Sequence, residues 1–255
     1  MTVDLGRLVA HLNEYLQVGL FQESAINGLQ VSGKKRVRRV ALAVDGVLET
    51  FEKAVAEGAD LLIVHHGIYW GHQWALRGAD YKRVKVLMDA ELALYAAHLP
   101  LDAHPEVGHA VNLLRAAGAD EDSLNPFGNH RGQTIGFSGE IRPTKRDDFS
   151  DLLGKVLGGD IQVLPFGPDE VRRVACVTGQ GADFSLVREA KINNIHYYIS
   201  GEAAHPIYHF CKEQGVNLGL GGHYRTETFG LKALAAHLER QFDLSCVFIE
   251  VPTGM

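Results

Sequence analysis

Short apolar runs alternate with segments of helical period along most of the chain, and this alternation constrains the fold more than any other feature. The predicted strands are residues 40–44, 60–64 and 92–97, and the predicted helices are residues 2–16, 48–57, 82–90 and 105–117. Strands joined by crossover helices form parallel sheets covered by helices. The sequence therefore predicts an α/β fold.

An internal repeat predicts that this fold is made of two related α/β lobes. Residues 37–41 (VRRVA) recur 134 positions later, and at the same offset residues 59–67 share a strand-to-glycine pattern with residues 193–201. Turn-forming residues at 125–129 and 165–168 are the predicted joints, and they bracket a segment, 134–164, with strand and helix signals of its own. We expect an internal duplication, with approximate lobes at 1–125 and 126–255 that interleave in places.

Composition excludes several classes of protein. A chain of 255 residues with 46% hydrophobic and 22% charged residues predicts a packed globular fold. A net charge of -6 provides no basic field for nucleic acid, and no apolar run or leader pattern indicates a membrane or secreted protein, so we expect a cytoplasmic one. The widely spaced Cys176, Cys211 and Cys246 favour reduced thiols over disulfides.

Adjacent histidines stand at the carboxyl end of a predicted buried strand. His65 and His66 follow the apolar run 61–64, at the position where open α/β sheets assemble their sites. Because successive residues of a strand point to opposite sides, one ion would meet both imidazoles only with difficulty. The doublet therefore favours two neighbouring ions.

A second polar cluster, residues 98–104, follows the predicted strand at 92–97. Asp102 offers the anionic oxygen that divalent ions favour, although a helix-capping role before Pro105 is the simpler interpretation of this residue alone. His98 suits three roles, which are a metal ligand, a partner that orients a ligand, and a proton carrier.

A third cluster, residues 221–227, follows a predicted strand at 216–220. His223 and Glu227 are four residues apart, so one helical turn would place them on the same face. The glycines before them let the backbone approach an ion or ligand closely. All three clusters follow predicted strands and offer nitrogen and carboxylate oxygen without thiolate, which favours zinc, iron, manganese or cobalt. We expect the metal site to lie between the two lobes.

Four segments together resemble the GTP cyclohydrolase I type 2 (NGG-interacting-factor-like) family. They are residues 64–67 (VHHG), 98–103 (HLPLDA), 200–205 (SGEAAH) and 222–227 (GHYRTE). The resemblance implies a dinuclear site in which His66 and Asp102 hold one metal, His65 and His223 hold the other, and Glu227 bridges both. It also implies a ring-shaped homohexamer.

The leading hypothesis for function is a metal-dependent hydrolase that acts on a nucleotide or related small molecule through a hydroxide bridging two divalent ions per subunit. His98 is the candidate for proton transfer, and Arg225 the candidate for binding an anionic substrate. Glu202 and His205 are expected near the site as orienting or substrate-contacting groups, or simply on the surface. A metal carrier and an interaction scaffold without catalysis remain as alternatives.

Overall fold

The computed structural model describes residues 2–72 and 74–255, and the chain packs into two compact units. Unit 1 comprises Met1–Leu101 and Leu231–Val251, and unit 2 comprises Asp102–Gly230 and Pro252–Met255. The chain thus leaves unit 1 earlier than the expected division near residue 125, and it returns to unit 1 near its end.

Unit 1 is built on a five-stranded sheet with the order β13-β4-β5-β6-β2. Its strands are β2 (Gly28–Val31), β4 (Arg39–Asp45), β5 (Leu61–His66), β6 (Ala93–Ala96) and β13 (Ser245–Phe248). The first four strands in that order are parallel to their neighbours, and β2 runs antiparallel to β6. A short antiparallel ladder joins β1 (Val3–Asp4) to β3 (Arg36–Val37). The predicted strands at 40–44, 60–64 and 92–97 are confirmed as β4, β5 and β6.

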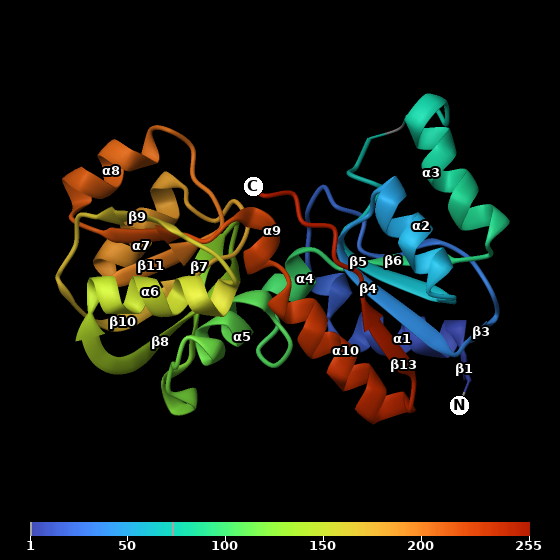
Figure 1. Cartoon of the computed structure of the whole chain (residues 1–255), viewed down its shortest axis with the longest axis horizontal. Coiled ribbons are helices and arrows are strands. Elements are labelled where there is room, and N and C mark those ends of the chain that lie inside the picture. Colours follow the sequence, from blue (N-terminus) through green and yellow to red (C-terminus); the bar gives the residue numbers. More distant parts are fainter. Residues whose placement is uncertain (1, 73) are drawn as a thin grey trace. The chain divides into compact units, whose positions relative to one another are not determined.

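Helices cover both faces of this sheet. They are α1 (Leu5–Tyr15), the 3₁₀ turn η1 (Val18–Leu20), α2 (Leu48–Ala56), α3 (Gly78–Asp89) and α10 (Phe229–Phe242). Helices α2 and α3 lie on one face, and α1 and α10 on the other (Figure 1). Burial on both sides explains the uninterrupted apolar runs of the central strands. Helix α1 begins three residues later than expected because Asp4 caps it, accepting the backbone N–H of Arg7 at 3.3 Å.

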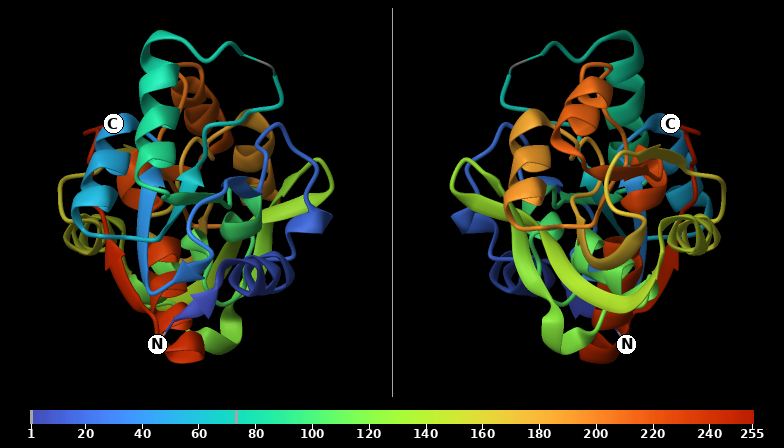
Figure 2. Two further views of the ribbon diagram at one scale, coloured as in Figure 1. Left: turned by 90° about the vertical axis from the view of Figure 1, so that its right-hand side faces the viewer. Right: turned by 90° about the vertical axis from the view of Figure 1, so that its left-hand side faces the viewer.

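Unit 2 is built on a six-stranded sheet with the order β7-β8-β10-β11-β12-β9. Its strands are β7 (Asn125–His130), β8 (Gln133–Lys145), β9 (Gln162–Pro165), β10 (Glu170–Cys176), β11 (Tyr197–Ser200) and β12 (Asn217–Leu220). Strands β10, β11 and β12 are parallel, and the outer strands pair antiparallel. The long strand β8 is curved (Figure 2). Its register with β10 shifts between Val171 and Arg173.

The helices of unit 2 also pack on both faces of its sheet. They are α4 (Leu99–Asp102), which crosses the unit boundary, α5 (His109–Ala116), η2 (Glu121–Ser123), α6 (Arg146–Leu157), α7 (Phe184–Ile192), α8 (Ile207–Gln214) and α9 (His223–Thr226). Helices α5 and α6 bury Leu114 and Leu153 against Val174 of β10. This packing places α5 in unit 2. The pairing of β13 with β4 returns Leu231–Val251 to unit 1, before the last residues, Pro252–Met255, rejoin unit 2.

One predicted joint is a strand instead of a turn. Residues 125–129 belong to β7, at the outer edge of its sheet. Proline is tolerated at a sheet edge because a missing N–H costs no ladder hydrogen bond there, which accommodates Pro126. The Glu189 carboxylate accepts the N–H of Gly128 at 3.0 Å and the N–H of Asn129 at 2.9 Å, so a side chain supports this irregular strand. The second predicted joint, 165–168, is a connection between β9 and β10, but it lies within unit 2 and does not join the two units.

The two units repeat one order of elements. Unit 1 runs α1-β2-β4-α2-β5-α3-β6, apart from the small β3, and unit 2 runs α6-β9-β10-α7-β11-α8-β12. In each, three parallel strands are flanked by an antiparallel strand beside the third. This order supports the predicted internal duplication, which stays a prediction.

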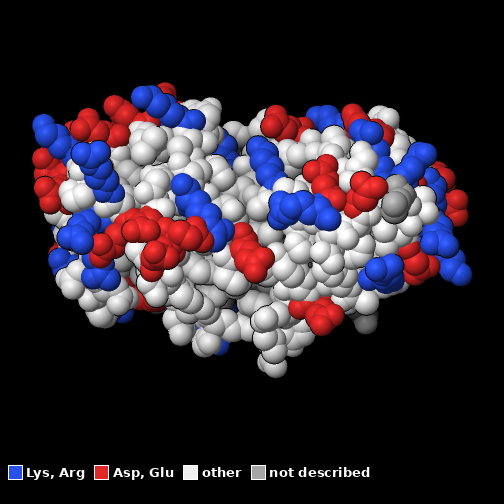
Figure 3. Space-filling view, turned by 90° about the horizontal axis from the view of Figure 1, so that it is seen from below, with Lys and Arg blue, Asp and Glu red and all other residues white. Residues whose placement is uncertain are grey.

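The surface carries charges of both signs. Lys and Arg are interspersed with Asp and Glu on the face shown in Figure 3. Several form ion pairs, among them Lys34 with Asp60 at 3.0 Å and Lys53 with Glu49 at 2.8 Å. Within residues 2–72 and 74–255, no helix is long and apolar enough to cross a membrane.

Candidate metal centre

Three histidines cluster at the carboxyl ends of β5 and β6 in unit 1. His65 and His66 end β5, and His98 follows β6, whose Ala96 lies opposite Val64 of β5. The ring centroid of His65 lies 4.6 Å from that of His66 and 4.9 Å from that of His98. One ring nitrogen of each histidine lies within 4.8 Å of the other two. Although both residues of the doublet belong to β5, their rings lie close together, with an angle of 55° between the ring planes.

Hydrogen bonds at Nδ1 fix the tautomers of the doublet. His65 Nδ1 lies 2.9 Å from the carbonyl oxygen of Ala97, and His66 Nδ1 lies 2.8 Å from Asp45 Oδ1. A carbonyl and a carboxylate only accept, so each Nδ1 carries the hydrogen. The lone pair of each neutral ring is then on Nε2, which is the arrangement of metal-binding histidines.

His98 has the same arrangement with a more buried carboxylate. Its Nδ1 hydrogen-bonds Glu23, which also accepts the N–H of Leu99 at 3.1 Å and the amide of Asn27 at 2.7 Å. Burial raises the pKa of Glu23, but these hydrogen bonds outweigh it and hold the pKa below its ordinary value. Glu23 therefore stays ionised and orients His98, whose ring also contacts the ring of Trp70.

A second group of ligand-type residues lies in unit 2. His223 begins α9 directly after β12, and Glu227 caps the end of this short helix. His223 Nε2 lies 3.2 Å from Glu227 Oε1, and its Nδ1 lies 2.9 Å from Oε1 of Glu202, which follows β11. The hydrogen bond to Glu227 is the main reason that the pKa of His223 is raised to about 9, against the opposing effect of burial, and Glu202 raises it further. The predicted one-turn geometry of His223 and Glu227 is what the structure shows.

Two glycines let the backbone of unit 2 approach these side chains. A Cβ on Gly179 would lie 2.1 Å from Glu227 Oε1. A Cβ on Gly201 would lie 2.6 Å from the carbonyl oxygen of Gly179 and 2.8 Å from His223 Cα. Real Cβ atoms do not approach other atoms so closely, so this part of the site requires glycine.

Asp102 ends α4 and is buried in unit 2, with 7% of its surface exposed. Thr178, just after β10, donates its hydroxyl to Asp102 Oδ1 at 3.1 Å. The helix-capping alternative for Asp102 does not hold, because Gly108 is the N-cap of α5. Asp102 is thus a buried carboxylate held by a hydroxyl group, which fits a metal ligand.

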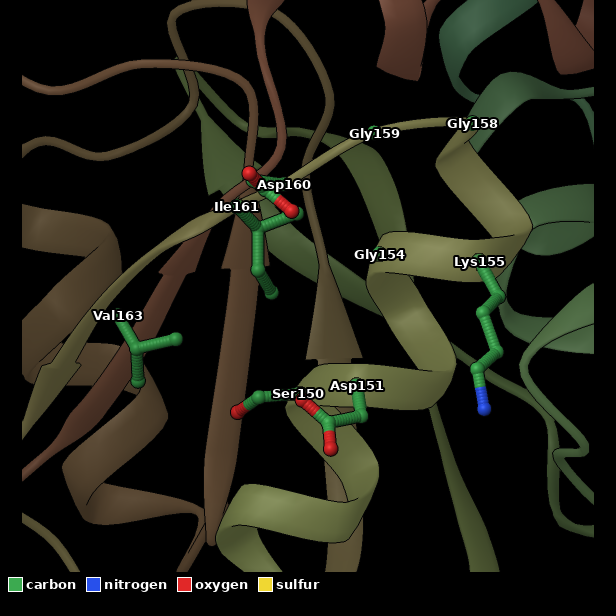
Figure 4. Close-up of a pocket in the computed structure, with 9 residues that line it drawn as sticks. All are labelled: Ser150, Asp151, Gly154, Lys155, Gly158, Gly159, Asp160, Ile161 and Val163. Atoms are coloured by element: carbon green, nitrogen blue, oxygen red, sulfur yellow. The ribbon is translucent and has the colours of Figure 1, made fainter.

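Arg225 and His205, which the sequence analysis also named, have surroundings of their own in unit 2. Arg225 donates to the carbonyl oxygen of Asp160 at 2.8 Å, so one end of its guanidinium holds a loop of unit 2. His205 is exposed before α8 and lines a cavity of about 340 Å³ with Tyr208 and His209. A cavity of about 550 Å³ lies between α6 and the segment 158–163 (Figure 4), and its lining includes none of the five predicted ligands.

Sequence reasoning missed the partners that orient the histidines. Asp45 ends β4 directly opposite His66 of β5 in the parallel register, so the rule that identified His66 also applied to Asp45. Thr178 follows β10 in the same way. Glu23 lies in an irregular segment whose sequence has no periodic signal.

Comparisons with known proteins agree with this architecture. The family model described as Duf34/NIF3 (NGG1p interacting factor 3) matches residues 3–254. Two proteins named GTP cyclohydrolase 1 type 2 homolog are similar over 99% of this chain. The Deinococcus radiodurans protein is 41% identical, with 95% of its length covered, and the Halobacterium salinarum protein is 43% identical, with 100% covered.

Solved structures of related sequence share the whole fold. A Thermus thermophilus protein is 38% identical with a TM-score of 0.88, and protein ybgI, described as of unknown function, is 32% identical with a TM-score of 0.91. Each comparison covers 99% of this chain and 100% of the other. The chain belongs to the Duf34/NIF3 family.

Proposed function

We propose that this protein binds two divalent metal ions per subunit and uses them to hydrolyse a nucleotide or related small molecule. The ligands would be His65, His66, Asp102, His223 and Glu227. The observation that carries the proposal is the common hydrogen-bonding state of the histidines. Each of His65 and His66 has Nδ1 on an oxygen acceptor, which directs its metal-binding electron pair to Nε2. His223 has a carboxylate at each ring nitrogen, so it would release the Nε2 proton to become a ligand.

The donor set fits a pair of divalent ions. It offers imidazole nitrogen together with two buried carboxylates, Asp102 and Glu227. Cys176 and Cys211 are buried, and burial raises the pKa of the Cys211 thiol to about 11, so thiolate does not compete for the ions. Nitrogen and oxygen donors without sulfur favour zinc, iron, manganese or cobalt.

Bound divalent ions supply an acidified water and polarise the substrate bond to be cleaved. His98 would carry the proton in this reaction, because Glu23 holds its Nδ1–H and leaves Nε2 to exchange a proton. Trp70 beside it gives the ring an apolar neighbour. Arg225, one end of which holds the Asp160 loop, would bind an anionic part of the substrate.

Other elements of the proposal rest on resemblance. Relatives named GTP cyclohydrolase 1 type 2 homolog support a nucleotide as the substrate class. The family resemblance supports a homohexamer, and the sequence supports a cytoplasmic location.

The test combines metal analysis with single variants. Protein purified without added metal and then reconstituted should hold two ions per chain, while His66→Ala and Glu227→Ala should hold fewer and lose activity in a nucleotide hydrolysis screen. His98→Gln should retain both ions and lose turnover by about 10²–10⁴-fold, as expected for removal of a general acid or base. Full metal content and activity in the ligand variants would contradict the proposal.

A carrier would behave differently in the same experiment. It would give up its ions readily to an acceptor apoprotein, and His98→Gln would have no turnover to lose. That result would replace hydrolysis with metal delivery.

A further inference from the structure

A tryptophan that the sequence analysis did not single out lies beside the histidine cluster of unit 1. Trp70 follows β5 by four residues and is partly exposed. The centroid of its ring lies 5.2 Å from that of His98, with the ring planes at 75°, and 6.0 Å from that of His66, with the planes at 40°. The indole therefore borders both the proposed proton carrier and a proposed metal ligand.

Hydrogen bonds hold this indole in place. Its Nε1–H donates to the carbonyl oxygen of Gly67 at 3.0 Å. The backbone N–H of Ile68 donates to Gln30 Oε1 at 2.8 Å, which ties the same loop to β2. The Nε1–H is the one polar group of a tryptophan side chain, and Gly67 already accepts it. The exposed part of the ring is therefore apolar, and it offers a ligand only its π system and its carbon edge.

We propose that the planar heteroaromatic ring of the substrate, a nucleobase in a nucleotide, stacks against Trp70. Every base has a π face, so an aromatic side chain binds it by stacking without a hydrogen bond. A group bound at His66 or His98 has this apolar surface beside it, because the indole borders both imidazoles. Stacking would hold the base while the polar groups of the site act on the rest of the molecule. This inference rests on the proposed function and adds to it a residue that selects for the base.

Trp74, the other tryptophan of the chain, provides a matched control. It belongs to the same loop between β5 and α3. Its ring centroid lies 5.7 Å from that of Tyr69, and the Arg83 guanidinium lies 5.9 Å from it. The ring also packs against the hydrophobic core of unit 1. Loss of the Trp74 indole therefore reports what the loop loses when a packing contact is removed.

The test compares two ligands that differ in the base. GMP carries a guanine, whereas ribose 5-phosphate has the same sugar and phosphate without a base. The affinity of the zinc-reconstituted protein for each ligand would be measured by titration calorimetry, together with its zinc content. We expect Trp70→Leu to bind GMP about 5–150-fold less tightly, which is the range that stacking of one base on an aromatic side chain contributes.

The other variants separate stacking from support of the site. Trp70→Phe keeps an aromatic ring and should lose less affinity for GMP than Trp70→Leu, and Trp74→Leu should bind GMP as the unmodified protein does. The affinity for ribose 5-phosphate and the zinc content should be the same in all of these proteins. A purely structural role of Trp70 would act through His66 and His98, so it predicts equal losses for both ligands. Equal losses, or unchanged GMP affinity in Trp70→Leu, would overturn the proposal.

A second measurement reports on Trp70 directly. In the zinc-reconstituted Trp74→Phe protein, Trp70 is the remaining tryptophan, so GMP should quench its fluorescence as the ligand binds, and ribose 5-phosphate should not. An absence of quenching by GMP would overturn the stacking role. If GMP quenches the fluorescence but the protein hydrolyses no nucleotide, the proposed function fails as hydrolysis, whereas the stacking role of Trp70 stands.

Discussion

Replacing Asp45 with alanine should weaken metal binding at His66 while leaving the fold almost unchanged. The parallel register of β4 and β5 places Asp45 beside His66, and the two side chains meet at 2.8 Å. Asp45 holds the hydrogen on Nδ1, which keeps the lone pair on Nε2. Without this carboxylate the ring can rotate and adopt the other tautomer.

The structure allows the two effects on free energy to be separated. Loss of a carboxylate that orients a metal-binding histidine costs about 10–100-fold in metal affinity, or about 1.4–2.8 kcal/mol. The pair is partly exposed, with 19% of the His66 side chain and 25% of the Asp45 side chain accessible, so its direct effect on folding should stay below about 1 kcal/mol. Asp45→Asn keeps an oxygen acceptor without the charge and should show about half of the loss in binding free energy.

The assay is chelator competition for Zn²⁺, paired with urea unfolding of the metal-free variants. Asp89→Ala is a matched control, because it also removes one carboxylate from an ion pair. The partner of Asp89 in this exposed pair is Lys85, at 2.6 Å, instead of a histidine. Unchanged Zn²⁺ affinity in Asp45→Ala would refute the reasoning that Asp45 sets the state of His66. An equal loss in the control would show that surface charge, not orientation, determines the affinity.

Two further predictions concern stability. Gly201→Ala would press a Cβ against the carbonyl oxygen of Gly179 and His223 Cα, so it should lower the free energy of unfolding by about 1–3 kcal/mol in urea titrations. Gly19→Ala, which has open space around its Cβ, should cost far less, and equal losses would refute this steric account. In unit 1, His11 and His237 share a hydrogen bond between their Nε2 atoms at 2.9 Å, and burial lowers the pKa of His11 below 6.5 although Glu14 opposes the shift. Since the unfolded chain then binds the proton more tightly, stability should fall as pH drops from about 6.5 through the folded pKa, and a double substitution to Phe should remove this part of the pH dependence.

The central strands were predictable because burial on both faces leaves a direct mark on sequence. Residues 40–44 and 61–64 are apolar without alternation. The structure places the predicted strands 40–44 and 60–64 as β4 and β5, within one residue at their amino ends and two at their carboxyl ends. The outer strands left no such mark. In β7, Pro126 and Gly128 predict a turn, and only the pairing with β8 makes this segment a strand.

The positions of candidate site residues were predictable where strand order alone determines position. His65 and His66 end a parallel strand and His223 follows one, and the carboxyl ends of neighbouring parallel strands meet at one edge of a sheet. Glu23 could not be found in this way. It reaches His98 across 75 positions, so this pair depends on tertiary packing that local sequence does not encode.

Because tertiary packing determines these contacts, the number of histidines in a sequence is by itself a poor guide to metal sites. Sequence shows 13 histidines, but it does not show which ring nitrogen carries hydrogen. An acceptor at Nδ1 prepares His65 to bind a metal through Nε2. In the buried His109, the first residue of α5, Nδ1 accepts the N–H of Gly230, so a neutral ring carries its hydrogen on Nε2. An acceptor at Nδ1 does not by itself identify a metal ligand, because the exposed His72 also has its Nδ1 on a carbonyl oxygen, that of Trp70. A ligand therefore requires both this tautomer and a position beside other donors, and the second condition comes from strands ending together.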